Sequence, residues 1–236
     1  KSEHLKNPSM VAIHNYINTY YVPNNMAVVL VGDLRLDKTI KMVDQYFGTF
    51  KYKELPMIKK LSESPMTSIV SREVKSPTAE RLTMAWRTSG VGTKEARLAT
   101  IAAEILSNQG DVGLIDTNIN QKQTALGAGA YTSAFNDYGY LAMTISVKED
   151  QTLEEGKNLL LAEANKIKKG EFDEWMIQAI INNMKLDEMK NFESVDGLAT
   201  TMYNAYIQGR SWNEIVSEIN EYSKITKADV VKFANE

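Results

Sequence analysis

The sequence predicts an α+β fold, in which a mostly antiparallel sheet is flanked by helices. Residues 125–135 and 138–147 read as two strands joined by a turn at Asn136-Asp137, and alternation of polar and apolar residues in the second is typical of a β-hairpin. The predicted elements follow the order β-β-α-α-β-β-α-α-α-α from residue 67 onward. Paired strands of this kind favour an antiparallel sheet over a doubly wound parallel one.

The first fifty residues predict a helix, a strand and a second helix. Residues 10–21 place apolar side chains at helical spacing and stop before Pro23, because the residue before proline is pushed out of the helical region. The six apolar residues Met26–Val31 predict a strand buried on both faces. Apolar residues then recur at helical spacing from Leu36 to Phe47, with Asp37 as the predicted N-cap. A single strand needs partners on both sides, so this piece resembles the tail of a domain.

A linker is predicted at residues 51–65, where two prolines and four lysines show no clear period. Beyond it, 67–75 and 81–88 are predicted strands, followed by a helix at 95–107 behind Thr93 and a short helix at 113–123.

The rest of the chain, after the hairpin, is predicted to be helical. Thr152 with Glu155 forms a capping-box signature that opens a helix ending near Gly170. A long helical pattern covers 172–208 with a break near Asp196-Gly197, and Ser211 and Thr226 begin the last two helices.

Composition excludes several classes of function. The chain has 236 residues, is 43% hydrophobic and carries a net charge of −3, without a basic stripe that would indicate a nucleic-acid surface. It contains no cysteine, which excludes disulfides, thiolate metal sites and cysteine nucleophiles. No apolar run approaches the ~18–20 residues of a membrane span. This composition is compatible with both a periplasmic and a cytoplasmic location, so it does not determine the compartment.

The sequence offers no recognisable catalytic or metal-binding set. The only histidines, His4 and His14, are ten residues apart and do not share a helical face, so neither is predicted to bind a metal. Adjacent carboxylates such as Glu154-Glu155 are interpreted as solvated or as complementing the start of a helix. Gly127-Ala128-Gly129 is interpreted as a close-packed strand rather than a nucleotide loop.

One segment resembles a known family. The letters YYVPNNM at residues 20–26, followed by an apolar run and Gly32-Asp33, resemble the end of the first half-domain of pitrilysin/insulinase zinc peptidases, a fold shared with mitochondrial processing peptidase. The Gly-rich strand that leads to Tyr131 also resembles this family, and the likeness covers nearly the whole chain. The family's inverted zinc motif, His-x-x-Glu-His, is absent.

The resemblance implies a division of the chain. Residues 1–50 would complete a preceding catalytic-type half-domain, 51–65 would be the linker, and 66–236 would form a complete inactive half-domain. Zinc is then expected in the catalytic half-domain upstream, and no cofactor in this chain. In catalytically competent relatives a Tyr at the position of Tyr131 works with an upstream Arg to hold substrate carbonyl oxygens. Here the upstream positions are Gln121, Lys122, Gln123 and Thr124, so a packing role for Tyr131 is favoured over a substrate contact.

Two functions follow from the resemblance. The favoured one is a non-catalytic, structural domain that walls the substrate chamber of a zinc-dependent endopeptidase acting on peptides. The alternative is an assembly or partner-binding scaffold of the same fold without peptidase activity. A free-standing hydrolase is a third, less favoured reading. The expected partners are a catalytic half-domain, in the same polypeptide or a paired subunit, and a peptide substrate. We also expect the isolated chain to self-associate through Met26–Val31.

Overall fold

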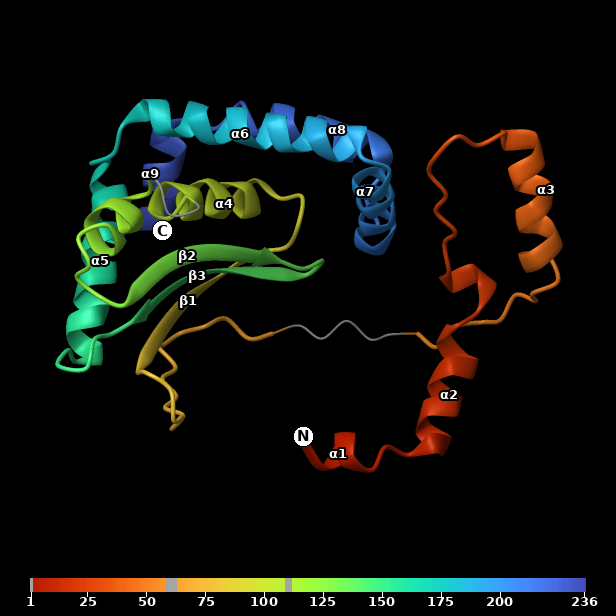
Figure 1. The fold of residues 1–236 in the computed structure, drawn as a ribbon, viewed down its shortest axis with the longest axis horizontal. Helices are drawn as coiled ribbons and strands as arrows, with labels where there is room; N and C mark the ends of the chain where they lie inside the picture. The colour runs from red at the N-terminus through yellow and green to blue at the C-terminus, as the bar shows by residue number, and fades with distance from the viewer. Residues whose placement is uncertain (1, 58–62, 109–111) are drawn as a thin grey trace. The chain divides into compact units, whose positions relative to one another are not determined.

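The computed structural model of the chain describes residues 2–57, 63–108 and 112–236, and these divide into two compact units. One unit contains the residues up to Arg72 together with Ser194–Tyr203, and the other contains Glu73–Glu193 together with Asn204–Glu236. Figure 1 shows the elements of each unit with their labels. The predicted division into 1–50, 51–65 and 66–236 stays a prediction, and residues 58–62 of the predicted linker lie outside the described residues.

The first unit begins with short helices. Its elements are α1 (Ser2–Lys6), α2 (Met10–Tyr20), the 3₁₀ turn η1 (Pro23–Asn25) and α3 (Leu36–Phe47). The hydroxyl of Ser9 caps α2 by accepting a hydrogen bond from the Ala12 amide. The two predicted helices are therefore confirmed, but Asp37 is not the N-cap: Arg35 occupies that position and Asp37 lies in the first turn.

Two predicted strands are wrong. Met26–Val31 is extended chain without a ladder and is not buried, because Met26, Val28 and Leu30 keep 40%, 45% and 50% of their surface exposed. Thr67–Lys75 is likewise exposed and unpaired as a strand. A strand is held by bonds to its neighbours, and neither segment finds a neighbouring strand within the described residues. Apolar composition alone therefore predicted a strand at each of these two segments, where the structure has none.

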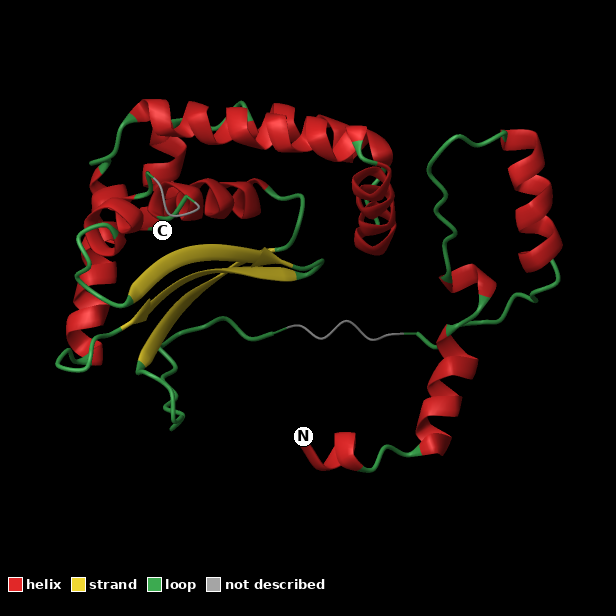
Figure 2. Cartoon of the chain, viewed as in Figure 1, coloured by secondary structure: helices red, strands yellow, loops and turns green. Residues whose placement is uncertain are grey.

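The sheet of the second unit has three antiparallel strands in the order β1-β3-β2. Their bounds are β1 (Arg81–Ser89), β2 (Gly127–Ala134) and β3 (Tyr138–Ser146). Strand β3 is central, with Met143 opposite both Met84 and Ala130. The predicted hairpin and its turn at Asn136-Asp137 are confirmed, and Figure 2 shows the sheet in yellow among the helices.

Helical elements make up the rest of the chain. They are α4 (Lys94–Leu106), the π-helical turn η2 (Asp116–Asn120), α5 (Leu153–Lys169), α6 (Glu174–Glu193), α7 (Val195–Gln208), α8 (Trp212–Tyr222) and α9 (Lys227–Asn235). Capping boxes at Thr152, Ser211 and Thr226 are confirmed. The break in the long helical pattern falls at Ser194, slightly before the predicted position. The predicted helix at 113–123 is mainly the π-turn η2.

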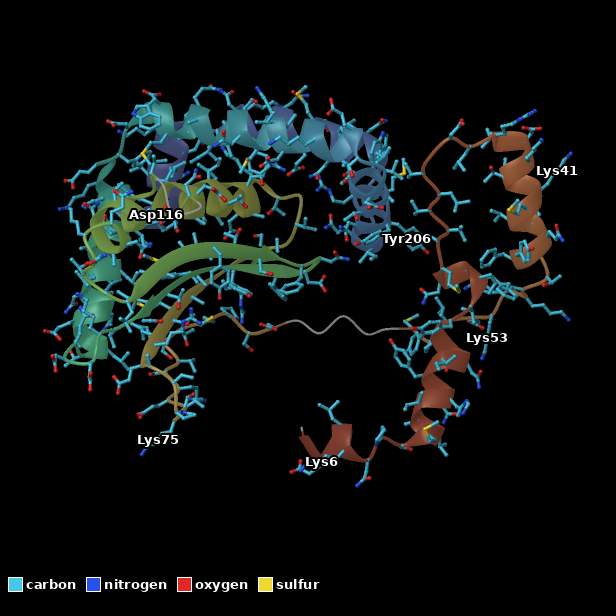
Figure 3. The ribbon with its side chains drawn as sticks, in the orientation of Figure 1. Lys6, Lys41, Lys53, Lys75, Asp116 and Tyr206 are labelled. Carbon is cyan, nitrogen blue, oxygen red and sulfur yellow. The ribbon has the colours of Figure 1, made fainter. Side chains whose placement is uncertain are left out.

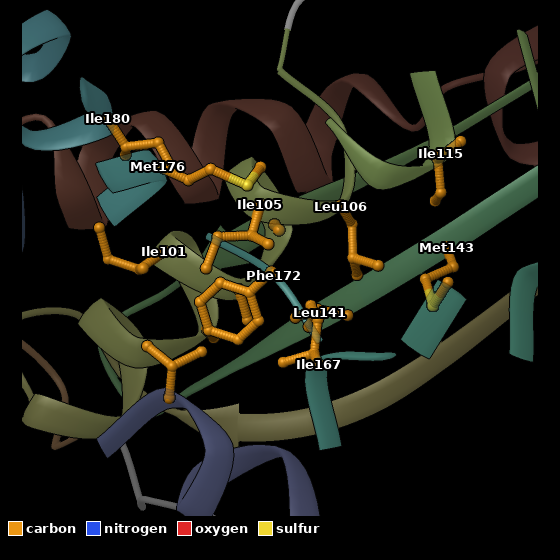
Figure 4. Packing of buried hydrophobic residues seen from close by; sticks show 14 of the residues in the cluster. Ile101, Ile105, Leu106, Ile115, Leu141, Met143, Ile167, Phe172, Met176 and Ile180 are labelled. Carbon is orange, nitrogen blue, oxygen red and sulfur yellow. The ribbon is translucent and has the colours of Figure 1, made fainter. Parts of the chain in front are cut away.

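The core lies between the helices and one face of the sheet. Ile101 and Ile105 of α4 pack above Met143 and Ile145 of β3, and these four side chains are at most 1% exposed. Figure 4 shows side chains of this core that come from α4, β3 and α6, among them Ile101, Met143 and Met176. Each fully buried side chain of this size contributes about 1.5–3 kcal/mol. The predicted α+β class is confirmed, and the core leaves the opposite sheet face for other contacts.

Candidate functional site

The candidate site is the sheet face that points away from the core, which we call the outer face. Side chains alternate between the two faces along a strand, and Leu141, Met143 and Ile145 belong to the core. The intervening residues and their register partners therefore form the outer face. These are Arg81, Thr83, Ala85, Arg87 and Ser89 of β1, Tyr138, Tyr140, Ala142, Thr144 and Ser146 of β3, and Gly127, Gly129, Tyr131 and Ser133 of β2.

Tyr131, the residue singled out from the sequence, lies on the outer face. It is opposite Ala142 in the β2–β3 register, and 47% of its surface is exposed. Its ring meets Tyr140 edge to face, with 6.2 Å between centroids and an interplanar angle of 79°. Tyr131 thus has both a packing contact and an accessible surface.

Arg87 brings a cation to the same face. It lies opposite Tyr140 in the β1–β3 register, and its guanidinium carbon is 5.4 Å from the centroid of the Tyr138 ring. At this distance the ring quadrupole attracts the cation, which orients the guanidinium. The sequence pattern missed Arg87, because only the register of β1 on β3 places it beside the tyrosines.

The segment upstream of Tyr131 holds the strand rather than a ligand. Gln121, Lys122 and Gln123 follow η2 and are exposed. Asn120, one residue earlier, uses its side-chain amide as a neighbouring strand would: Nδ2 donates to the Ala128 carbonyl and Oδ1 accepts from the Ala128 amide, both at 2.9 Å. Asn120 therefore fixes the start of β2, three residues before Tyr131.

A buried carboxylate fixes Asn120 in turn. Asp116, labelled in Figure 3, is fully buried and accepts hydrogen bonds from the Ser107 hydroxyl at 3.0 Å and from Asn120 Nδ2 at 3.3 Å. The amides of Asn108 and Gly113 also donate to it, at 2.6 and 3.2 Å. This arrangement satisfies the carboxylate without a cation. Burial, and then the negative charges of Asp116 and Asp187, raise the pKa of nearby Glu104.

A cavity adjoins the same strand. It has a volume of about 510 Å³ and lies where β2 begins, between Asn120, Leu126 and Lys148. Gln123, Ala125, Gly127 and Ala128 also line it, and it adds a recess at one end of the sheet.

The donor groups among the described side chains do not fit zinc. His14 lies exposed on α2, and the side chain of His4 is outside the described residues. Among the side chains that the structure describes, no group of three or more His, Asp or Glu is arranged to hold a metal ion. Glu155 instead accepts from the backbone and hydroxyl of Thr152, which lowers its pKa. Within the described parts, no helix is long and apolar enough to cross a membrane.

Comparisons with known proteins agree on one family. Residues 11–184 match the family model described as the peptidase M16 inactive domain. A zinc protease named PqqE, from Helicobacter pylori, is 19% identical over 238 residues, covering 98% of this chain and 53% of the relative. The chain therefore spans about half the length of the curated relative it matches.

Solved structures show the same fold. A protease from Helicobacter pylori matches 99% of this chain and 57% of its own, with a TM-score of 0.83 and 18% identity. A peptidase M16 inactive domain from Pseudomonas fluorescens matches 97% of this chain and 54% of its own, with a TM-score of 0.71 and 12% identity.

Proposed function

Because the chain belongs to the peptidase M16 inactive-domain family, we propose that it is the non-catalytic half of a zinc-dependent endopeptidase. The match confirms the family resemblance seen in the sequence. The proposed partner is the half that carries His-x-x-Glu-His, in the same polypeptide or in a paired subunit. This half would supply the metal, for which the present chain has no fitting set of donors among its described side chains.

We further propose that the outer face forms part of the wall against which a peptide lies. The single observation that carries this is the accessible Tyr131, whose ring meets Tyr140 while Arg87 lies on the other outer strand of the same face, on a sheet whose opposite face is filled by the core. Aromatic rings and a guanidinium suit the apolar side chains and polar groups of an extended peptide. Asn120 supports the same assignment because it holds β2 in place.

Tyr131 would make fewer contacts with the substrate than the corresponding Tyr does in relatives that use a Tyr–Arg pair. No arginine lies at 121–124, so the phenol of Tyr131 would contact substrate carbonyl oxygens without that arginine beside it. We propose that Tyr131 packs against Tyr140 and offers the peptide a side contact.

The missing arginine also favours a second candidate, a scaffold that keeps the fold and has lost peptidase activity. Its partner-binding surface would be the same outer face. The two candidates differ in whether a zinc motif accompanies this chain.

The reading frame around the chain distinguishes them. We expect His-x-x-Glu-His, with a further glutamate downstream, in the same polypeptide or in a subunit that co-purifies with it. The isolated chain should not hydrolyse a quenched fluorescent peptide, with or without a chelator. Absence of the motif from both places would support the scaffold, and chelator-resistant turnover by the isolated chain would contradict both candidates.

A further inference from the structure

We infer that the cavity at the start of β2, hereafter the recess, binds the C-terminal carboxylate of a peptide together with its last side chain. This inference rests on the proposed function, in which the chain handles peptides, and adds where one end of the peptide binds and by what chemistry.

Two side-chain amides hold the walls of the recess in place. Gln151 joins the segment after β3 to the segment before β2, because its Oε1 accepts from the Lys148 amide at 3.3 Å and its Nε2 donates to the Thr124 carbonyl at 3.1 Å. Asn120 fixes a third segment through both backbone groups of Ala128. The recess therefore has a defined shape before a ligand enters, which lowers the conformational entropy lost on binding.

Lys148 supplies the charge of the recess. Its side chain is exposed, and among the described residues that line the recess it is the one charged group. Within the described parts of the chain its ammonium forms no ion pair, although Glu149 and Asp150 follow it in the sequence. An ammonium without a counter-charge favours an anionic ligand, and a carboxylate can accept its hydrogen bonds.

Gln123 adds a second polar side chain to the lining. Its backbone has a φ of 52°, in the left-handed region that glycine and asparagine occupy more readily than glutamine. Its side-chain amide can donate to one carboxylate oxygen while Lys148 donates to the other. The lining thus offers two donors of different kinds to one anionic group.

The same lining has an apolar part. Leu126 keeps 62% of its surface exposed, and Ala125 lies next to it. A C-terminal residue carries its carboxylate and its side chain on the same carbon atom, so an apolar last residue presents both groups together. A Glu or Asp side chain presents the carboxylate at its own tip, without an apolar branch. The combination of Lys148 with Leu126 therefore fits a chain end better than an acidic side chain.

The backbone leaves room for such a ligand at Gly127. Its φ is not positive, and an added Cβ would meet no atom within 4 Å. Neither the backbone nor a neighbouring side chain therefore requires glycine here, and a glycine within a strand often marks a place where a ligand approaches closely. The volume of about 510 Å³ is within the range of small-ligand sites, about 300–1,000 Å³.

The test measures fluorescence anisotropy of three short peptides with the full chain. All carry the label at the N-terminus and differ only at the other end: Leu with a free carboxylate, Leu with an amide, and Glu with an amide. We expect the peptide with the free carboxylate to bind about three- to fivefold more tightly than the other two, the size of one exposed ion pair. Added salt should remove most of this difference.

Three variants locate the binding. Lys148→Gln should weaken the free-carboxylate peptide to the level of its amide and leave the amide unchanged. Lys185→Gln is the matched control, because Lys185 is exposed on α6 and outside the lining; it should change none of the peptides. Gly127→Val fills the recess and should weaken both Leu peptides. Thermal melts by circular dichroism establish that each variant is folded.

Equal binding of the free-carboxylate and amide peptides would overturn the inference, and so would a folded Lys148→Gln variant that binds as the wild type does. Equally tight binding of the Glu amide would show that the recess does not select a chain end. The proposed function is tested separately: if a zinc-bearing partner needs this chain for peptide hydrolysis and the peptide ends bind equally, only the inference fails.

Discussion

At the scale of single residues, Asn120 is the side chain on which the geometry of the candidate site most depends. Its amide bonds both backbone groups of Ala128, and Asp116 holds that amide from the buried side. A side chain that pairs with an edge strand in this way supplies backbone hydrogen bonds that would otherwise have to come from a further strand.

Replacing Asn120 tests this role. Asn120→Ala leaves the Ala128 amide and carbonyl, and one side of Asp116, without their partner. We expect the free energy of unfolding to fall by about 1–3 kcal/mol, measured by urea denaturation. Lys122→Ala is the control, because its bond to Asn118 lies at the surface, and its effect should stay within about 0.5 kcal/mol. Equal effects of the two variants would show that the pairing does not stabilise the sheet.

Asp229 makes stability depend on pH. Its carboxylate accepts from Lys94 Nζ at 2.7 Å and from the hydroxyl and amide of Thr226, which lowers its pKa to about 2 from 3.8. A depressed carboxyl pKa stabilises the fold above the unfolded pKa near 4, and this contribution is lost as the pH falls from about 4 towards 2.

We therefore expect Asp229→Asn to be less stable than the wild type at pH 6, with the difference shrinking by pH 3. Urea denaturation at the two pH values measures it. Asp150→Asn, at an exposed loop position, is the control, and its effect on stability should stay within about 0.5 kcal/mol. A difference for Asp229→Asn that grows on acidification would contradict the assignment.

The sequence predicted the residue-scale site in part. Tyr131 was found because the Gly-rich motif is local in the chain. Arg87, Asn120 and Asp116 were missed, because their roles arise from strand register and from contacts between segments that no local pattern encodes.

At the scale of elements, an ion triad joins α8 to the start of α4. Glu218 of α8 pairs with Arg97 at 3.2 Å and with Arg210, whose side chains keep only 12% and 14% of their surface exposed. Arg97 also donates to the Gly92 carbonyl in the loop that leads from the sheet into α4. The triad therefore links α8 to the loop beside β1.

Removing the shared carboxylate should loosen this link. Glu218→Ala leaves two largely covered arginines without their counter-charge, and we expect a loss of about 1–3 kcal/mol in the free energy of unfolding. Glu221→Ala serves as the control, because its pair with Lys224 is more exposed. Equal losses for Glu218→Ala and Glu221→Ala would mean that the triad is no stronger than a surface pair.

Elements with local signals were predicted well. Thr152, Ser211 and Thr226 each carry both halves of a capping box within four residues, so the sequence alone locates those helix starts. The strands at 26–31 and 67–75 were predicted wrongly. A strand depends on partner strands elsewhere in the chain, whereas the local sequence shows only how hydrophobic the segment itself is.

At the scale of the whole molecule, Met26–Val31 is an exposed apolar run in the first unit. Such a segment can add as a strand to another chain. We expect concentration-dependent self-association by light scattering, reduced by Val28→Lys. Leu36→Lys, on a more exposed apolar residue outside the run, is the matched control and should leave association unchanged. A wild-type chain that stays monomeric at high concentration would refute this expectation.

The central proposal is that this chain is the non-catalytic half of a zinc-dependent endopeptidase. The most direct measurement is hydrolysis of a quenched fluorescent peptide by the zinc-bearing half, alone and mixed with the full chain. The account predicts little turnover by either part alone and a chelator-sensitive rise on mixing, saturating at a fixed ratio of the two. Full activity of the zinc-bearing half alone, unchanged by adding this chain, would contradict it.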